Sequence, residues 1–125
     1  MGKICHDDFL DGALNILKSN ATRLCVCTTQ PTTYTEAITT NMLAIKTITS
    51  TDFTGPSNGD TNGRKIAVNS GSGLTVSSTA TASHVALADS VTSRLWYVTT
   101  CTPQGLTSGN TVNVPAWDIE IADPT

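Results

Sequence analysis

Four cysteines and two histidines are the residues of this 125-residue chain with the most specific chemistry. Cys25 and Cys27 form a C-x-C pattern on an expected strand, so both thiols face one side, about 6.6 Å apart along the strand. Zinc needs its sulfur ligands closer together than a straight strand places them, and neither histidine has ligand-like spacing to this pair. We therefore expect no metal and no cofactor, and we favour buried free thiols. A disulfide between Cys25 or Cys27 and Cys101 remains open.

Serine and threonine hydroxyls are abundant, but the chain lacks the partners that would make one of them a nucleophile. Hydrolases need a base and an orienting acid beside the hydroxyl, and His6 and His84 are the only histidines. His84 begins an expected strand, where a sheet position explains it, and no G-x-S-x-G pattern occurs. Glu36 and Glu120 are the only glutamates, so a pair of catalytic carboxylates would have to rely on aspartate. We therefore expect no enzymatic activity.

Composition limits the class of protein further. Charged residues make up 14% of the chain, the net charge is −3, and 23 threonines and 11 serines supply small hydroxyls. The lack of clustered Lys and Arg argues against nucleic acid as a partner. No apolar run exceeds four residues, and acids follow Lys3 where a signal peptide needs apolar residues. We therefore expect no membrane span and no secretory signal. A mass of 13.1 kDa fits a single domain over 1–125.

The first twenty residues predict an N-terminal arm and one α-helix. Apolar residues recur at helical spacing after Asp7, namely Phe9, Leu10, Ala13, Leu14, Ile16 and Leu17. Asp7 and Asp8 suit the helix N-terminus as cap and as partners of the helix dipole. Asn20 suits a left-handed stop. The arm and helix are expected to occupy 1–20, and a β-domain to occupy 21–125.

From residue 22 onward, β-branched residues and period-two alternation predict short strands, with Asn-Gly pairs and a Ser-Gly-Ser-Gly run at turns. The expected strands are Thr22–Thr28, Arg64–Asn69, Leu74–Ser77, Ser83–Ala88, Arg94–Thr100, Thr111–Val114 and Trp117–Ala122. Tyr34–Ile45 fits a short helix or a covering loop, and Ala44–Thr49 fits another strand. Phe53–Gly63 is expected to be a surface loop. The chain is therefore predicted to be mainly β, an antiparallel β-sandwich or barrel-like sheet with one N-terminal α-helix.

Two long stretches of the expected β-domain carry no formal charge, namely Ile66–Ala88 and Leu95–Trp117. The exposed positions of those strands must therefore be Thr, Ser and Asn. Charged side chains at sheet edges are the usual protection against association between strands of different molecules. A sheet this poor in charge is therefore expected either to be covered by partner molecules or to bind them as part of its function. An extracellular-style sandwich with a threonine-rich face fits the composition equally well.

Several strings of residues resemble small virion-associated proteins of tailed bacteriophages. These strings are Cys5–Leu14, Leu24–Cys27, Gln30–Ala37, Asp52–Pro56, Gly63–Lys65 and Val114–Asp123, which together extend over nearly the whole chain. The resemblance implies a structural role in the phage particle, as a head decoration (cement) protein or as a tail component, and it implies no catalytic residues. A small β-domain that binds only the assembled capsid lattice would stabilise that lattice by mass action.

On this resemblance we expect a capsid decoration protein of the virion, made in the bacterial host cytoplasm. The expected partners are the major capsid protein and further copies of the chain, and a trimer would match the local threefold positions of an icosahedral lattice. Ile4 in the arm and Phe53 and Pro56 in the loop are expected to reach the shell. Trp117 follows Pro115, which indicates a sheet edge or bulge, and is a fourth interface candidate. The alternatives are a tail, connector or head-fibre component, or a small carbohydrate- or receptor-binding β-sandwich.

Overall fold

The computed structural model describes residues 2–124 and is mainly β, with antiparallel sheets and one long N-terminal helix. This confirms the predicted fold class. The chain forms two compact units, and each is assembled from segments that are separate in sequence. Unit 1 contains Met1–Asn20, Thr49–Ser70 and Pro115–Thr125, and unit 2 contains Ala21–Ile48 and Gly71–Val114. The predicted division after residue 20 coincides with a boundary between the units, but the rest of the chain is shared between both.

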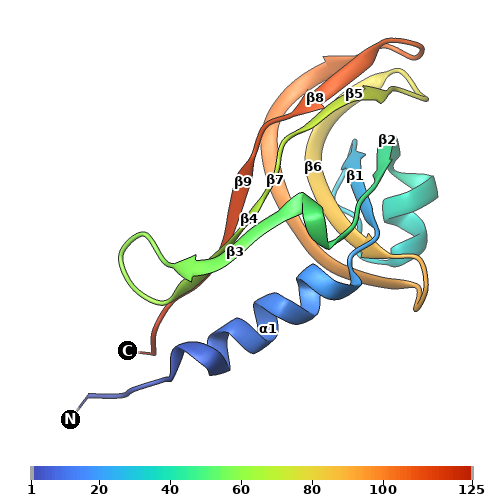
Figure 1. Ribbon diagram of the computed structural model, residues 1–125. Coiled ribbons are helices and arrows are strands. Elements are labelled where there is room, and N and C mark those ends of the chain that lie inside the picture. Colours follow the sequence, from blue (N-terminus) through green and yellow to red (C-terminus); the bar gives the residue numbers. More distant parts are fainter. Residues whose placement is uncertain (1, 125) are drawn as a thin grey trace. The chain divides into compact units, whose positions relative to one another are not determined.

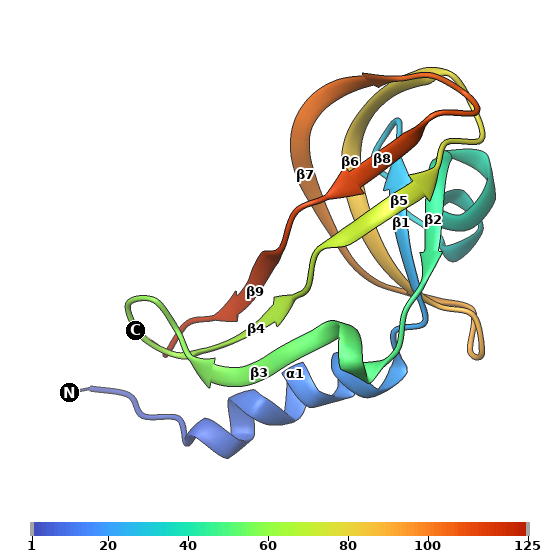
Figure 2. The same cartoon turned by 45° about the horizontal axis from the view of Figure 1, so that its top comes forward.

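Unit 1 places the helix α1 (Asp7–Asn20) on a three-stranded antiparallel sheet (Figures 1 and 2). The strands are β3 (Phe53–Asn58), β4 (Arg64–Val68) and β9 (Trp117–Ile121), in the order β3-β4-β9, and the short helix η2 (Ser50–Asp52) precedes β3. The buried apolar residues of the helix and sheet are Leu10, Leu14, Leu17, Phe53, Ile66, Val68 and Ile119. Burial of this set holds α1 on the sheet, because a helix of this length has little stability alone.

The C-terminal end of α1 differs from the prediction. Asn20 is the last helical residue, and its side-chain amide donates a hydrogen bond to the carbonyl oxygen of Ile16 at 2.8 Å. Among the described residues, Ser93 is the only non-glycine with a positive φ, so Asn20 is not the left-handed stop that was expected. A side-chain bond to the last turn therefore ends this helix in place of a left-handed cap.

The prediction of a surface loop over Phe53–Gly63 is wrong for its first half, which forms β3. Gly55 has a φ of 110°, and the pairing of β3 with β4 shifts register between Thr54 and Ser57. Pro56 lacks an N–H, and proline is tolerated in a sheet only at edge strands and bulges. Both conditions are met here, because β3 is an edge strand and Pro56 lies within its register shift. Residues that are typical of turns therefore occur here in a bulged edge strand, which is why the sequence alone predicted a loop.

Unit 2 contains a curved four-stranded sheet in the order β2-β1-β6-β7 and a separate pair of strands, β5 and β8. The elements are β1 (Arg23–Cys27), η1 (Glu36–Thr40), β2 (Met42–Thr47), β5 (Gly71–Thr75), β6 (Ala80–Asp89), β7 (Arg94–Leu106) and β8 (Thr111–Val114). Figures 1 and 2 show β6 and β7 curving along their length. The Ser77 N–H donates to the Leu43 carbonyl at 2.8 Å and so joins the segment after β5 to β2. The arrangement is barrel-like but not closed.

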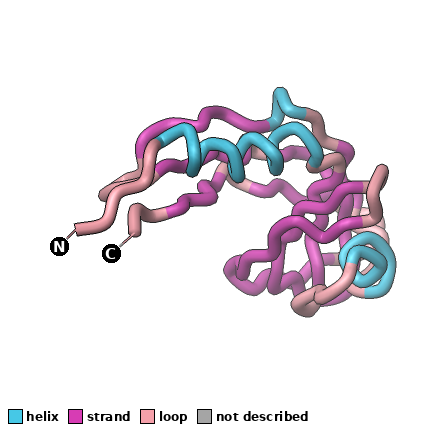
Figure 3. Tube along the Cα trace, turned by 90° about the horizontal axis from the view of Figure 1, so that it is seen from below, coloured by secondary structure: helices cyan, strands magenta, loops and turns pink. Residues whose placement is uncertain are grey.

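The strands of unit 2 match the prediction in order but not always in length. β8 has the predicted bounds, whereas β6 and β7 extend beyond the predicted Ser83–Ala88 and Arg94–Thr100. The extensions pair with each other, from Ala80 opposite Leu106 to Ala82 opposite Gln104. Of the two alternatives for Tyr34–Ile45, the short helix occurs as η1, and the strand expected at Ala44–Thr49 occurs two residues earlier as β2. Figure 3 distinguishes these helical and strand segments along the chain.

Candidate interaction surface

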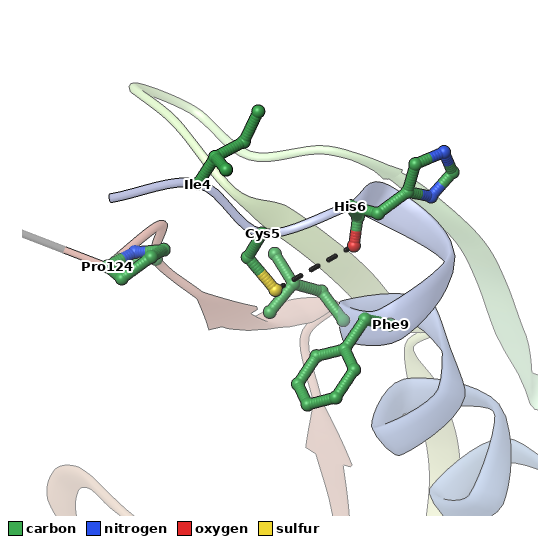
Figure 4. Close-up of a pocket in the computed structure, with 7 residues that line it drawn as sticks. Ile4, Cys5, His6, Phe9 and Pro124 are labelled. Atoms are coloured by element: carbon green, nitrogen blue, oxygen red, sulfur yellow. Dashed lines mark hydrogen bonds between the residues drawn. The ribbon is translucent and has the colours of Figure 1, made fainter. Parts of the chain in front are cut away.

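The N-terminal arm leads into an open apolar groove beside the start of α1. Its volume is about 620 Å³, and its lining consists of Ile4, Cys5, His6, Phe9, Leu10, Ala122 and Pro124. Figure 4 shows that these residues come from the arm, the first turn of α1 and the segment after β9. Ile4 is 96% exposed and Phe9 is 77% exposed. Burial of two large apolar side chains against a partner is favourable, so this groove has the character of a protein-binding surface.

His6 determines how α1 begins. Its Nδ1 accepts a hydrogen bond from the backbone N–H of Asp8 at 3.1 Å, and its carbonyl oxygen accepts one from the N–H of Phe9 at 3.0 Å. These bonds satisfy donors that the helix N-terminus leaves free. His6 thus has the capping role predicted for the aspartates, while Asp7 and Asp8 supply negative charge to the first turn. The cap holds Phe9 in the first turn, beside the groove.

The helix has two apolar faces, of which only one is buried in unit 1. The buried face consists of Leu10, Leu14 and Leu17. The exposed face, called the α1 stripe below, consists of Phe9, Gly12, Ala13 and Ile16. Their spacing of three, one and three residues places them along one line of the helix surface. Because Phe9 also lines the groove, the groove and the α1 stripe form one continuous apolar surface.

Charged groups fix α1 to its sheet on the side away from this surface. Arg64 of β4 donates two hydrogen bonds to the carboxylate of Asp11, at 2.8 and 3.2 Å, and one to Asn58 Oδ1 at 2.7 Å. The hydrogen bonds that Arg64 donates to Asp11 raise the pKa of Arg64, helped by the nearby charge of Asp7. Lys18 Nζ donates to the carbonyl oxygen of Gly55 at 3.0 Å. Most charges near the helix are therefore engaged within unit 1, and the α1 stripe is left uncharged.

The four predicted interface residues have different surroundings. Ile4 lies on the surface as predicted and lines the groove. Phe53 does not, because it is 4% exposed and belongs to the core of unit 1 as the first residue of β3. Pro56 and Trp117 are half-buried, in the edge strands β3 and β9 respectively. The edge position predicted for Trp117 is confirmed, but the groove lining includes Ile4 without the other three.

The apolar stripe expected over residues 9–17 is buried only in part. Phe9 and Ile16 are exposed, the latter at 52%, whereas Leu10, Leu14 and Leu17 are buried. A signal for this was present, because the apolar residues come as adjacent pairs at 9–10, 13–14 and 16–17. At about 100° per residue these pairs cover an arc of about 160°, which is wider than one small sheet can bury.

The cysteines do not form a reactive centre. All four are free thiols, and Cys25 and Cys27 are fully buried with Ala37 and Ala86. Burial, with a smaller contribution from Cys27, raises the pKa of Cys25 to about 12, and burial followed by the charge of Cys101 raises that of Cys27 to about 11. Such thiols stay protonated at neutral pH and act as small apolar side chains.

Ser83 and His84 are adjacent in β6. Ser83 Oγ lies 2.7 Å from His84 Nδ1 and donates a hydrogen bond to the Thr28 carbonyl at 2.8 Å. Within residues 2–124, no cluster of three or more His, Cys, Asp or Glu side chains is arranged to hold a metal ion. None of the helices in the described part of the chain is both long and apolar enough to cross a membrane.

Comparison with protein-family models, with curated proteins and with solved structures gives no match to this chain. The feature with the clearest capacity to act is the apolar groove with the adjoining α1 stripe, and its chemistry is that of protein–protein contact.

Proposed function

We propose that this protein is a structural component of a tailed bacteriophage particle, bound to the head as a decoration protein that joins neighbouring capsid subunits. Its partners in this proposal are the major capsid protein and further copies of the chain, and its location is the virion. The resemblance of strings such as Cys5–Leu14 and Val114–Asp123 to virion-associated phage proteins supports the setting. The proposal assigns no catalytic step to the protein.

The observation that carries this proposal is the open apolar groove with Ile4 and Phe9 exposed beside it. Ile4 in the arm and Phe9 in the first turn of α1 expose apolar surface to water. A neighbouring subunit that covers the groove would remove this surface from water, which is favourable. Binding that requires the assembled lattice stabilises that lattice by mass action. The strands β5 and β8 carry no charged residue, so they lack the charges that usually keep the sheet edges of different molecules apart.

The experiment that tests the proposal is quantitative mass spectrometry of purified virions, with the copies of this protein expressed relative to the major capsid protein. A lattice-wide decoration protein should be present at a ratio close to one. A handful to a few dozen copies per particle would place the protein in the tail, connector or head fibres, and the decoration proposal would be wrong.

Binding of variants to phage heads that lack this protein tests whether the groove makes the contact. The double variant Ile4→Ser, Phe9→Ser should lose most of its binding to such heads, because the apolar contact is removed. Lys3→Ser is the matched control, since it alters an exposed arm residue that does not line the groove. Equal binding of the double variant and the control would exclude the groove as the contact.

A further inference from the structure

A glycine in the middle of α1 has no explanation within unit 1. Gly12 is exposed, and a Cβ placed on it would meet nothing within 4 Å. Its helical backbone requires no glycine, because Gly12 is not among the residues with positive φ. Glycine at an exposed helix interior is unfavourable relative to almost any other residue. A close approach by another backbone is the circumstance in which the missing side chain becomes useful.

The α1 stripe has an order of side chains that reads the same from both ends. A large apolar residue is followed by two small ones and then by another large one, as Phe9, Gly12, Ala13 and Ile16. When two copies of the helix lie antiparallel, Phe9 meets Ile16 of the other copy and Gly12 meets its Ala13. The small residues let the axes approach closely at the centre, while the large ones fill the space on either side. A twofold axis requires this kind of self-complementary surface.

The helix dipole favours the same orientation. Antiparallel packing places the positive N-terminal end of each helix beside the negative C-terminal end of the other, whereas parallel packing would align the two dipoles. Asp11 and Lys18 are bonded within unit 1 on the side away from the stripe and do not oppose this contact. The stripe itself is uncharged.

We infer that the α1 stripe is a twofold docking surface for a second copy of this chain, with the two helices packed antiparallel. This inference deepens the proposed function, because it names the contact through which copies would join each other. The groove at Ile4, Phe9 and Pro124 continues the apolar surface beyond the helix (Figure 4). One helix pair with its flanking arms is smaller than a standard permanent interface, so the dimer is in equilibrium with the monomer.

Sedimentation equilibrium of the full chain tests this inference first. The average mass should rise from the 13.1 kDa of the monomer toward twice that value as the protein concentration increases, with a midpoint on the order of 10–100 µM for a small interface. A monomer at all concentrations up to about 1 mM would overturn the inference.

Gly12→Gln separates loss of docking from loss of folding. Glutamine is a better helix former than glycine and has open space at this position, so the variant should melt at a higher temperature. Its side chain would nevertheless keep the helices apart, and dimer formation should fall at least tenfold. Asn15→Gln, at an exposed position outside the stripe, is the control and should dimerise normally. Normal dimerisation of Gly12→Gln would contradict the inference.

Cysteine crosslinking determines the orientation, in a Cys5→Ser, Cys101→Ser background that removes the two half-exposed thiols. In the antiparallel pair, Ala13→Cys lies close to its own copy, offset along the axis by about 1.5 Å, and should form a disulfide-linked dimer. Ile16→Cys lies about 10 Å from its copy along the axis and should not. Crosslinking of Ile16→Cys as efficient as that of Ala13→Cys would overturn the antiparallel arrangement. A monomeric chain that still decorates heads at a ratio near one would refute this inference and leave the proposed function standing.

Discussion

At the scale of single residues, chemical reactivity follows burial more closely than residue type. Cys25 and Cys27 have the C-x-C spacing that first suggests a metal or redox site, yet both are fully buried among alanines. Water stabilises the thiolate, and its removal raises the pKa of Cys25 to about 12 and that of Cys27 to about 11. Their position on a central strand therefore makes them inert.

This leads to a prediction about thiol labelling. At pH 8 in native conditions, a thiol reagent such as iodoacetamide should modify the half-exposed Cys5 and Cys101 and leave Cys25 and Cys27 unmodified. Burial raises the pKa of Cys101, so its labelling rate should rise toward higher pH. Peptide mass spectrometry measures each site, and Cys101→Ser should reduce native labelling by one site. Rapid native labelling of Cys25 would contradict the buried thiol pair.

A second residue-scale prediction concerns two glycines with similar backbones and different surroundings. Gly63 has a φ of 72° and Gly73 a φ of 67°, but a Cβ on Gly63 would overlap the carbonyl oxygen of Ile121, whereas one on Gly73 meets nothing within 4 Å. Gly73→Ala should cost about 1–2 kcal/mol from left-handed strain alone. Gly63→Ala should cost at least about 2 kcal/mol more, because backbone must move. Denaturant unfolding of both variants provides the comparison, and equal losses would show that the overlap is relieved cheaply.

At the scale of elements, α1 joins two functions on one helix. Its buried face holds unit 1 together, and its other apolar face is available to partners. The ion pair between Arg64 and Asp11, with bonds at 2.8 and 3.2 Å, fixes the rotation of the helix on its sheet. Because that rotation decides which apolar residues are exposed, the charged contacts also determine where the α1 stripe faces.

The element-scale prediction compares two apolar residues of this helix. Leu14 is 2% exposed, so Leu14→Ala should destabilise the protein by about 2–5 kcal/mol through lost contacts and a cavity. Ile16→Ala removes an exposed side chain and should change the stability of the monomer by less than about 0.5 kcal/mol. Denaturant unfolding at low protein concentration, followed by circular dichroism, measures both. An unchanged stability of Leu14→Ala would mean that α1 docks on a partner instead of on its own sheet.

At the scale of the whole molecule, the chain is divided between two units that the linear sequence interleaves. Unit 1 takes both ends of the chain and a central segment, Thr49–Ser70, and unit 2 takes the rest. The groove and the α1 stripe both belong to unit 1, whereas β6 and β7, which carry Asp89 and Arg94 at one end and are otherwise uncharged, belong to unit 2. The sedimentation behaviour of the isolated chain and the head binding of the groove variant therefore test the surface of unit 1.

Local patterns of residues were enough to predict the class of the fold and most of its elements. Helical spacing over residues 7–18 and alternation over Thr111–Val114 are local patterns, and local patterns are sufficient for such elements. The same spacing indicated an apolar stripe on the helix, of which Leu10, Leu14 and Leu17 are buried. These outcomes depend on neighbours a few residues away, which the sequence displays directly.

Three features could not be predicted from local patterns, namely which half of the apolar arc of α1 is buried, where Phe53 lies, and how the chain is divided into units. Each of these depends on partners distant in sequence, such as Arg64 for the rotation of α1 and β4 for the strand that begins at Phe53. A pattern along one helix gives the width of its apolar arc but not the width of the sheet that will cover it. The exposed remainder, Phe9 to Ile16, is the surface from which the function is inferred, and it exists because the small sheet of unit 1 covers only the other side.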